Sequence, residues 1–414
     1  MMSPKYKIGS ILIVIFMIVV AWGYLGRGLE IGREDEHAYA NLLPLTATAG
    51  SLSSFNFETN LKSYTINVPN NILIIKDDII SHNSTLTFDS PMDNLQLLLP
   101  PTVDGSFPIH ISKGSFEVSF QVTVKEDAGA LVSGDEYHDY MRTFTTRYAK
   151  RSTGYPHMEQ AASYLEQQLK SFKLDTEIQR FQQENRDVLN VIGYHRGINR
   201  PEEWVVLGGH YDIKEKTIEG AYDNAAGTVA VLEIAKAISQ MKTDRTIVLC
   251  LWSGEEQGLW GSEFFVNNIP ENVTIKAYLN YDMVGLNWPQ VYQLNVLVGP
   301  DENGAEVENP ELLNVSNRVI DEILRYPSSG FDVKETGEGS SDQVSFWPIG
   351  VSTIYFSGLI VYPGYHNKVD DLATMEVLAG GRERLKEGFE TVVWVSYYAV
   401  ILLDNDELIK QKDT

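Results

Sequence analysis

The sequence predicts an α/β protein whose main part is a three-layer sandwich, in which helices flank a central, largely parallel mixed sheet. From about residue 135, apolar runs of strand length alternate with segments of helical periodicity, which is typical of a sheet covered by helices. Before that point, residues 45–130 contain only short strand-like runs, which predict a small β-rich module. A long uncharged run near the N-terminus predicts a membrane helix ahead of both parts.

The N-terminal segment carries no charged residue from Ile8 to Gly26. This length suits a membrane-spanning helix, which needs about 20 apolar residues. The stretch Ala21–Gly26 is a poor cleavage site for a signal peptidase. We therefore interpret residues 1–30 as an uncleaved signal anchor that holds the protein in a membrane, with the domains that follow it outside the cytoplasm. The alternative is a signal peptide that is removed, which would make the protein secreted.

The segment 45–130 is expected to consist of strands. Its clearest element is Ser115–Val124, where Phe116, Val118, Phe120 and Val122 alternate with polar neighbours. This period of two indicates a half-buried strand. No residue of the module suggests any chemistry, so its role is left open.

The third predicted domain covers residues 135–405. Its apolar spacing predicts helices over 156–170, 225–240 and 383–403 and strands over 176–181, 188–194, 204–207, 246–252, 276–281, 293–298 and 351–356. The last helix contains Glu387 and Glu390, which favour a helix packed on the core over a second membrane span.

Composition excludes several classes of function. Acidic residues outnumber basic ones 56 to 33, giving a formal charge of −23, so nucleic acid is not expected as a partner. Cys250 is the only cysteine. The chain therefore cannot form an internal disulfide or a cysteine zinc finger, and Cys250 in its apolar run is expected to be a buried, inert thiol.

Residues that can bind a metal follow the predicted strands. In open α/β sheets, ligands bind at the carboxyl ends of the strands, so side chains placed there are expected to converge. One further acid precedes the helix at 225–240. The residues concerned are His210, Asp223, Glu255, Glu256, Asp282 and His366.

This set matches the needs of a two-zinc hydrolytic site. Zinc accepts imidazole nitrogen and carboxylate oxygen, and two zinc ions about 3.5–4 Å apart need a shared carboxylate and a few terminal ligands. Two histidines and three carboxylates supply these ligands. The adjacent pair Glu255 and Glu256 leaves one further carboxylate free to act as a general base.

The motifs that contain these residues resemble those of the co-catalytic dizinc exopeptidases. This family includes aminopeptidase Y, the bacterial leucine aminopeptidases, plasma glutamate carboxypeptidase and glutaminyl cyclase. The resemblance covers about residues 137–403, in the family's order. The matching strings are Gly208–Asp212 (GGHYD), Gly220–Gly227 (GAYDNAAG), Ser253–Ser262 (SGEEQGLWGS), Asn280–Gly285 (NYDMVG) and Tyr365–Asp371 (YHNKVDD).

The resemblance implies a role for each residue. It implies two zinc ions, the first held by His210 and Asp282, the second by Glu256 and His366, with Asp223 as the bridge. Glu255 corresponds to the general base, and Asp212 to the residue that orients His210. The chain departs from the family at Ser341-Asp342-Gln343, where relatives often have a histidine in third place.

The expected activity is zinc-dependent hydrolysis of terminal peptide bonds, with peptides as substrates and an aminopeptidase as the favoured type. A carboxypeptidase or a cyclase of the glutaminyl cyclase type on the same scaffold is the alternative. The sequence Asp223–Gly227 is similar to the peptidases rather than to the cyclases. A non-catalytic scaffold is disfavoured because all five ligands and Glu255 are present.

Overall fold

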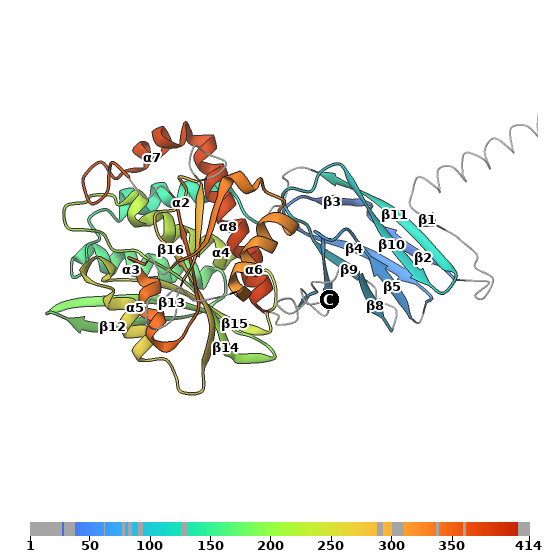
Figure 1. Cartoon of the computed structure of the whole chain (residues 1–414), viewed down its shortest axis with the longest axis horizontal. Coiled ribbons are helices and arrows are strands. Elements are labelled where there is room, and N and C mark those ends of the chain that lie inside the picture. The colour runs from blue at the N-terminus through green and yellow to red at the C-terminus, as the bar shows by residue number, and fades with distance from the viewer. Residues whose placement is uncertain are drawn as a thin grey trace, which may run out of the picture. The chain divides into compact units, whose positions relative to one another are not determined.

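The computed structural model describes residues 27–28, 38–61, 63–76, 79–81, 85–89, 94–125, 131–287, 293–299, 310–336, 339–358 and 362–404 (Figure 1). The chain divides into two compact units, Met1–Leu131 and Val132–Thr414. The predicted anchor run Ile8–Gly26 lies outside the described residues. Within the part of the chain that is described, no helix has the length and hydropathy needed to cross a membrane.

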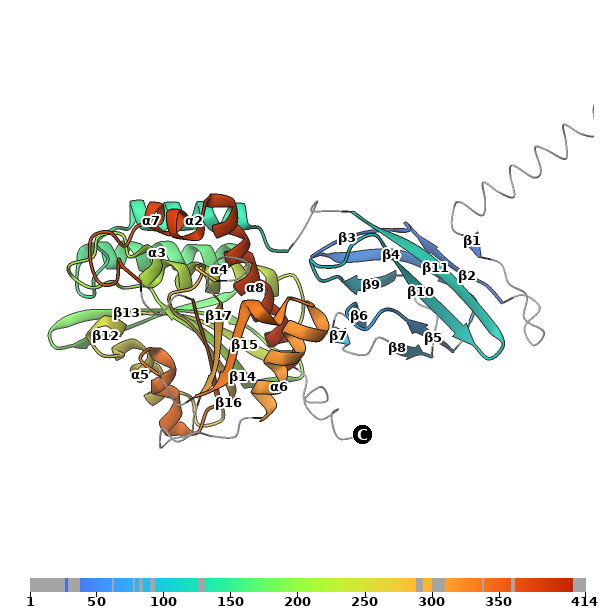
Figure 2. The same cartoon turned by 45° about the horizontal axis from the view of Figure 1, so that its top comes forward.

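The first unit is built from two β-sheets (Figure 2). One hydrophobic core draws on strands of both sheets. The predicted strand around Ser115–Val124 is present, and its alternate residues Phe116, Val118, Phe120 and Val122 are buried. The six-stranded sheet has the order β1 (Arg27–Gly28), β2 (Ala40–Leu43), β4 (Leu52–Thr59), β9 (Asn94–Leu98), β6 (Leu73–Lys76), β7 (Ile79–Ser81), and the five-stranded sheet β3 (Thr46–Thr48), β11 (Phe116–Lys125), β10 (Ser106–Lys113), β5 (Tyr64–Asn67), β8 (Thr85–Phe88).

The second unit contains one eight-stranded mixed sheet. Four of its strands, β15, β14, β16 and β19, run parallel to one another. The pairs β12–β13, β13–β15 and β17–β19 are antiparallel. The mixed α/β class predicted from the sequence is thereby confirmed. The order across the sheet is β12 (Asp175–Gln183), β13 (Arg186–His195), β15 (Arg245–Trp252), β14 (Arg200–His210), β16 (Thr274–Tyr281), β19 (Thr353–Ser357), β17 (Leu294–Gly299), β18 (Phe331–Glu335).

Helices lie on both sides of this sheet (Figure 2). Helix α4 contacts β14, β15 and β16 and is itself packed against α2 and α8, whereas α5 contacts β13 on the other side. The predicted helices are present, with bounds that differ by a few residues at most. The α-helices are α2 (Gly134–Arg147), α3 (Pro156–Ser171), α4 (Ala226–Ile238), α5 (Trp260–Asn267), α6 (Pro310–Asn317), α7 (Leu372–Ala379) and α8 (Arg382–Asp404).

An aromatic core fixes the central strands from the α5 side. Val248, Cys250 and Trp252 of β15 join one buried cluster with residues of the neighbouring strands, Phe265 of α5 and Phe346. Tyr278 of β16 stacks on Phe346 with ring centroids 3.9 Å apart. Cys250 lies in this cluster as a buried free thiol, and burial raises its pKa well above the usual range.

Glu233 of α4 is a fully buried carboxyl group away from the strand ends. Neither of its oxygens has a hydrogen-bond partner among the described residues, and its nearest cation, the Lys236 ammonium, is 3.8 Å away. Burial raises the pKa of Glu233 to about 8. The folded protein therefore keeps this proton up to a higher pH than the unfolded chain, so stability present at low pH is lost as pH rises from about 4.5 to 8.

Replacing Glu233 with glutamine is expected to remove this loss. The variant should match the parent at about pH 4, below the pKa of the unfolded chain, and exceed its unfolding free energy at pH 8 by on the order of a few kcal/mol, since one pKa unit corresponds to about 1.4 kcal/mol. Urea denaturation at the two pH values measures the difference. Glu263→Gln, at an exposed position of α5, is the control. Equal pH dependence of both variants would show that Glu233 is not protonated in the folded state.

Candidate metal centre

The carboxyl ends of the four parallel strands place the predicted site residues at one edge of the sheet. Strand β14 ends at His210, and Asp282 directly follows β16. After β15 the chain turns at Gly254, whose φ of +84° lies in the left-handed region, and then enters a short 3₁₀ turn with Glu255 and Glu256. The loop beyond β19 carries His366.

Asp223 reaches the same place from the turn ahead of α4. Residues Ala221–Ala225 form a single wide turn, in which Asp223 has an extended rather than a helical conformation. The chain can pass close to β16 here only because position 227 is glycine: a Cβ on Gly227 would lie 2.1 Å from the carbonyl oxygen of Tyr281. The Asn224 side chain donates to that same oxygen at 2.8 Å. These contacts hold Asp223 and Asp282 next to each other.

One group of side chains surrounds the imidazole of His210. Its Nε2 lies 3.3 Å from Asp223 Oδ1, 3.5 Å from Asp282 Oδ1 and 3.9 Å from Glu255 Oε2. His210, Glu255 and Asp282 form a set whose donor atoms are close enough to share one metal ion.

A second group surrounds His366. Its Nε2 lies 3.2 Å from Asp223 Oδ2 and 3.3 Å from Glu256 Oε2, and these three residues form a second set able to hold a metal ion. The two oxygens of Asp223 therefore face the two histidines separately. This is the arrangement required of a carboxylate that bridges two metal ions.

The electrostatics of the groups reflects their mutual proximity. Burial disfavours a charge on His210, but Glu255 and Asp282 raise its pKa well above the usual value. Hydrogen bonding to Asp223 and Glu256 raises the pKa of His366 to about 9. Burial raises the pKa of Glu255 well above that of an ordinary glutamate. The carboxylates of the two groups thus favour positive charge on His210 and His366.

The donor atoms fit zinc. His210 Nε2, Glu256 Oε1 and Asp282 Oδ1 are buried and have no hydrogen-bond partner among the described residues. Buried polar atoms are nearly always hydrogen-bonded or bound to a metal, so these three atoms indicate a cation site. Imidazole nitrogens and carboxylate oxygens are the ligands that catalytic zinc uses.

Asp212 contacts two residues of the first group, His210 and Glu255. It is fully buried, accepts a hydrogen bond from Thr153 Oγ1 at 2.9 Å and another from the Glu255 backbone N–H at 3.3 Å. Nδ1 of His210 lies 3.2 Å from the Asp212 carbonyl oxygen and 3.6 Å from its carboxylate. Asp212 therefore positions both His210 and the Glu255 segment.

Two buried supporting residues were not identified from the sequence. Asp370 accepts hydrogen bonds from the backbone N–H groups of Tyr222 at 2.8 Å and Asp223 at 3.1 Å, and burial raises its pKa to about 7. The fully buried Arg151 donates to the carbonyl oxygens of Tyr211 at 2.6 Å and Gly220 at 2.8 Å. Asp370 lies in the string Tyr365–Asp371, which resembles the family, and this resemblance is the sequence feature that could have identified it. Arg151 lies before all the matching strings, so no such feature indicates it.

The departure at Gln343 is accommodated by hydrogen bonds beneath the site. Gln343 Oε1 accepts from Asn280 Nδ2 at 2.8 Å, and the same nitrogen donates to Ser341 Oγ at 3.0 Å. Asp342 is buried, with a pKa raised to about 7 by burial, and accepts from Ser262 Oγ at 2.6 Å. Gln343 therefore ties this segment to β16 rather than reaching the metal-binding groups.

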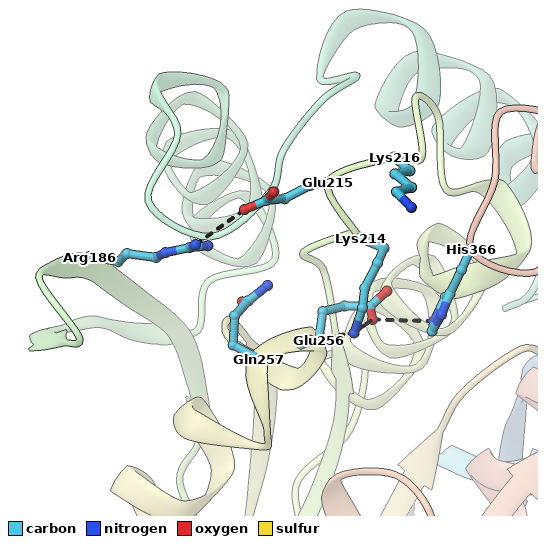
Figure 3. Close-up of a pocket in the computed structure, with 7 residues that line it drawn as sticks. All are labelled: Arg186, Lys214, Glu215, Lys216, Glu256, Gln257 and His366. Atoms are coloured by element: carbon cyan, nitrogen blue, oxygen red, sulfur yellow. Dashed lines mark hydrogen bonds and ion pairs between the residues drawn. The ribbon is translucent and has the colours of Figure 1, made fainter.

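A pocket of about 500 Å³ opens beside the second group (Figure 3). Within it, the Lys214 ammonium lies 3.1 Å from Glu256 Oε2 and donates to the Glu256 carbonyl oxygen at 2.6 Å. The pocket therefore opens next to the side chains of the second group. Its lining residues are Arg186, Lys214, Glu215, Lys216, Glu256, Gln257 and His366.

Comparison with known proteins confirms the resemblance drawn from the motifs. Residues 190–380 match the model of Peptidase family M28. The chain is 33% identical over 199 residues to a probable glutamate carboxypeptidase, LAMP1, of Arabidopsis thaliana, covering 45% of this chain and 28% of that protein. It is 27% identical over 237 residues to aminopeptidase YwaD of Bacillus subtilis, covering 55% of this chain and 48% of that one. The chain thus spans less than half the length of either relative.

The fold is shared with solved zinc aminopeptidases. The structure of BSAP, a zinc aminopeptidase from Bacillus subtilis, superposes with a TM-score of 0.54 at 17% identity, covering 64% of this chain and 95% of that one. At this level of identity the likeness concerns the fold. It places the eight-stranded sheet and its helices among the architectures on which such enzymes are built.

Proposed function

We propose that this protein is a zinc-dependent exopeptidase, of the aminopeptidase type, that removes terminal residues from peptides. The observation that carries the proposal is the position of Asp223, whose two oxygens face His210 and His366 at 3.3 and 3.2 Å. A single buried carboxylate between two sets of zinc-type ligands is the arrangement that a pair of metal ions requires.

In this proposal, His210 and Asp282 hold one zinc ion, Glu256 and His366 hold the other, and Asp223 is shared. Bound zinc supplies Lewis-acid chemistry, lowering the pKa of water toward about 7 and polarising a carbonyl group. The three orphaned donor atoms on His210, Glu256 and Asp282 support this assignment.

Glu255 acts as the general base. Its carboxylate accepts a proton from the attacking water and later gives it to the amine that leaves. The backbone N–H of Glu255 donates to the Asp212 carboxylate. The Glu255 carboxylate lies 3.9 Å from His210 Nε2, farther than the carboxylates of Asp223 and Asp282, so it is near the proposed metal position but is not the nearest oxygen to His210. Asp212, Asp370 and Arg151 position the reacting groups without touching substrate.

The test combines activity with metal content. The purified protein should hydrolyse unblocked aminoacyl peptides, lose this activity on chelation and regain it with zinc. Elemental analysis should give about two zinc ions per chain. One zinc ion together with cyclisation of N-terminal glutamine would favour the cyclase alternative, release from the carboxyl end would favour a carboxypeptidase, and no metal uptake would overturn the proposal.

The location of the protein is a separate proposal, motivated by the uncharged run Ile8–Gly26. We propose that this run anchors the chain in a membrane with the catalytic unit outside the cytoplasm. Protease treatment of intact cells should release a soluble, active fragment that lacks the N-terminus. Protein that lacks the N-terminal segment in the medium of untreated cells would indicate cleavage and secretion, and full-length, protected protein in the cytosolic fraction would contradict both arrangements.

A further inference from the structure

The pocket beside the second metal-binding group is rich in cations, although the chain as a whole has a formal charge of −23. Three of its seven lining residues, Arg186, Lys214 and Lys216, are basic. Of its two carboxylates, Glu256 is a proposed zinc ligand, and Glu215 lies 3.1 Å from the Arg186 guanidinium. The lining thus has an excess of basic over acidic side chains in a chain that is acidic as a whole, which suits an anion.

The contacts of Lys214 keep its ammonium group at the inner end of the pocket. It donates to the backbone carbonyl oxygen of Glu256 at 2.6 Å, in addition to its approach to the carboxylate at 3.1 Å. The carbonyl contact does not compete with a metal ion for the Glu256 carboxylate. Lys214 can therefore stay in place when that carboxylate binds zinc, and its charge is then less well balanced.

Arg186 is held at the other side of the pocket (Figure 3). Its side chain packs over Gly154, where a Cβ would lie 3.0 Å from Arg186 Cβ and 3.2 Å from Cγ. The guanidinium is bound to Glu215, so this pair contributes no net charge.

Lys216 differs from both because its ammonium has no ion pair or hydrogen bond among the described residues. In Figure 3 its side chain lies on the same side of the pocket as Lys214 and His366. An exposed, unpaired lysine that lines a pocket beside a buried metal-binding group is available to a bound ligand.

We propose that this pocket binds a carboxylate of the substrate, with Lys216 as the main contact and Lys214 as the second positive charge. The inference deepens the proposed function and rests on it: the enzyme acts on short peptides that carry a carboxylate near the scissile bond. This carboxylate is either the C-terminal group of a short peptide or an acidic side chain. A pocket of about 500 Å³ is within the range of small-molecule sites, which suits a short peptide.

Charge complementarity of this kind discriminates between substrates. Hydrogen bonds to ionised groups are stronger than neutral ones, and the attraction between exposed charges weakens as salt is added. A substrate in which an amide replaces the carboxylate has nearly the same shape but no longer has the negative charge that the lysines attract. The acid and amide forms of one peptide therefore isolate the contribution of the carboxylate charge, and a Lys216 variant shows how much of that contribution depends on Lys216.

The test measures binding in a protein that cannot turn the peptide over. In the zinc-loaded Glu255→Gln protein, calorimetry gives the dissociation constants of Leu-Leu and Leu-Leu-amide, and of Leu-Glu-amide and Leu-Gln-amide. The first pair reports a C-terminal carboxylate and the second an acidic side chain. At low salt, the acid of one pair should bind about tenfold more tightly than its amide, and added Lys216→Glu should reduce that ratio about five- to tenfold.

A matched charge reversal provides the control. Lys276 is an exposed lysine near the start of β16, at the end of the strand opposite to Asp282, so Lys276→Glu changes the net charge equally without touching the pocket. It should leave the acid-to-amide ratio unchanged, and Lys216→Gln should fall between Lys216→Glu and the parent.

Failure of the inference is distinguishable from failure of the proposed function. If neither pair shows a preference, if no peptide binds, or if Lys276→Glu acts like Lys216→Glu, the carboxylate pocket is wrong even for an active peptidase. If a Lys216-dependent preference is measured while the unaltered, zinc-loaded protein hydrolyses no peptide, the pocket stands and the proposed function falls.

Discussion

Glu255→Gln is expected to lower turnover by about 10²–10⁴-fold, because general acid–base catalysis contributes a factor of this size. Glutamine keeps the shape of the side chain but cannot accept a proton. The backbone N–H contact of residue 255 with Asp212 does not depend on the side chain and should persist. Zinc content should therefore stay close to that of the unaltered protein.

The neighbouring substitution Glu256→Gln is the matched comparison. The Glu256 carboxylate lies 3.3 Å from His366 Nε2 and has a buried oxygen without a hydrogen-bond partner, so its loss should weaken one zinc ion. Added zinc should partly restore Glu256→Gln and leave Glu255→Gln unchanged. Elemental analysis and turnover over a range of zinc concentrations measure both effects. If the two variants have the same metal content and the same response to zinc, the assignment of base and ligand is wrong.

Asp223→Asn should have the largest effect on metal binding. Because the two oxygens of Asp223 face the two histidines separately, the substitution should weaken both metal ions, whereas Asp282→Asn should weaken only the one at His210. Loss of a partner that merely orients a ligand costs about 10–100-fold in affinity, so loss of the bridge should cost at least about 10²-fold. Hydrolysis should become undetectable at zinc levels that saturate the unaltered protein.

Equilibrium dialysis against buffered zinc counts the ions that remain. The control is Asp175→Asn, an exposed aspartate of β12 that pairs with Arg196 on the surface. If Asp223→Asn releases one zinc ion and keeps the other at full affinity, Asp223 is a terminal ligand rather than a bridge.

The clustering of the proposed metal ligands could largely be predicted because all of them except Asp223 lie at or beyond the end of a strand. The short apolar runs before Glu255 and Glu256 and before Asp282 are typical of buried strands, and parallel strands bring their carboxyl ends together. Helix α2 has a weaker signal, because its buried face includes Tyr137 and His138 beside Met141. Strand β18 has only one fully buried residue, which leaves little periodicity to detect.

The contributions of Lys214, Arg151 and Asp370 could not be predicted in this way. Each acts on a residue that is distant in the sequence or on backbone groups, through contacts that arise only when loops are placed. A buried arginine that donates to three carbonyl oxygens has no pattern in its neighbourhood that separates it from a surface arginine. The residues proposed to bind metal are placed by the topology of the strands, whereas those that orient them are placed by packing between loops.

The scatter of the ligands along the chain has a consequence for how the protein opens. The only cysteine is a free thiol, so no covalent cross-link joins the loops that run from His210 to His366. A pair of zinc ions would serve as that cross-link, because the ligands connect the ends of the central strands. Zinc that binds the folded protein would stabilise it, and any unfolded chain that kept its zinc would have fewer conformations open to it. Without metal, these loops should be the first to open and to be cut by a protease, while the aromatic core beneath them stays folded. Bound metal would then determine the resistance of the protein to proteolysis as well as its activity.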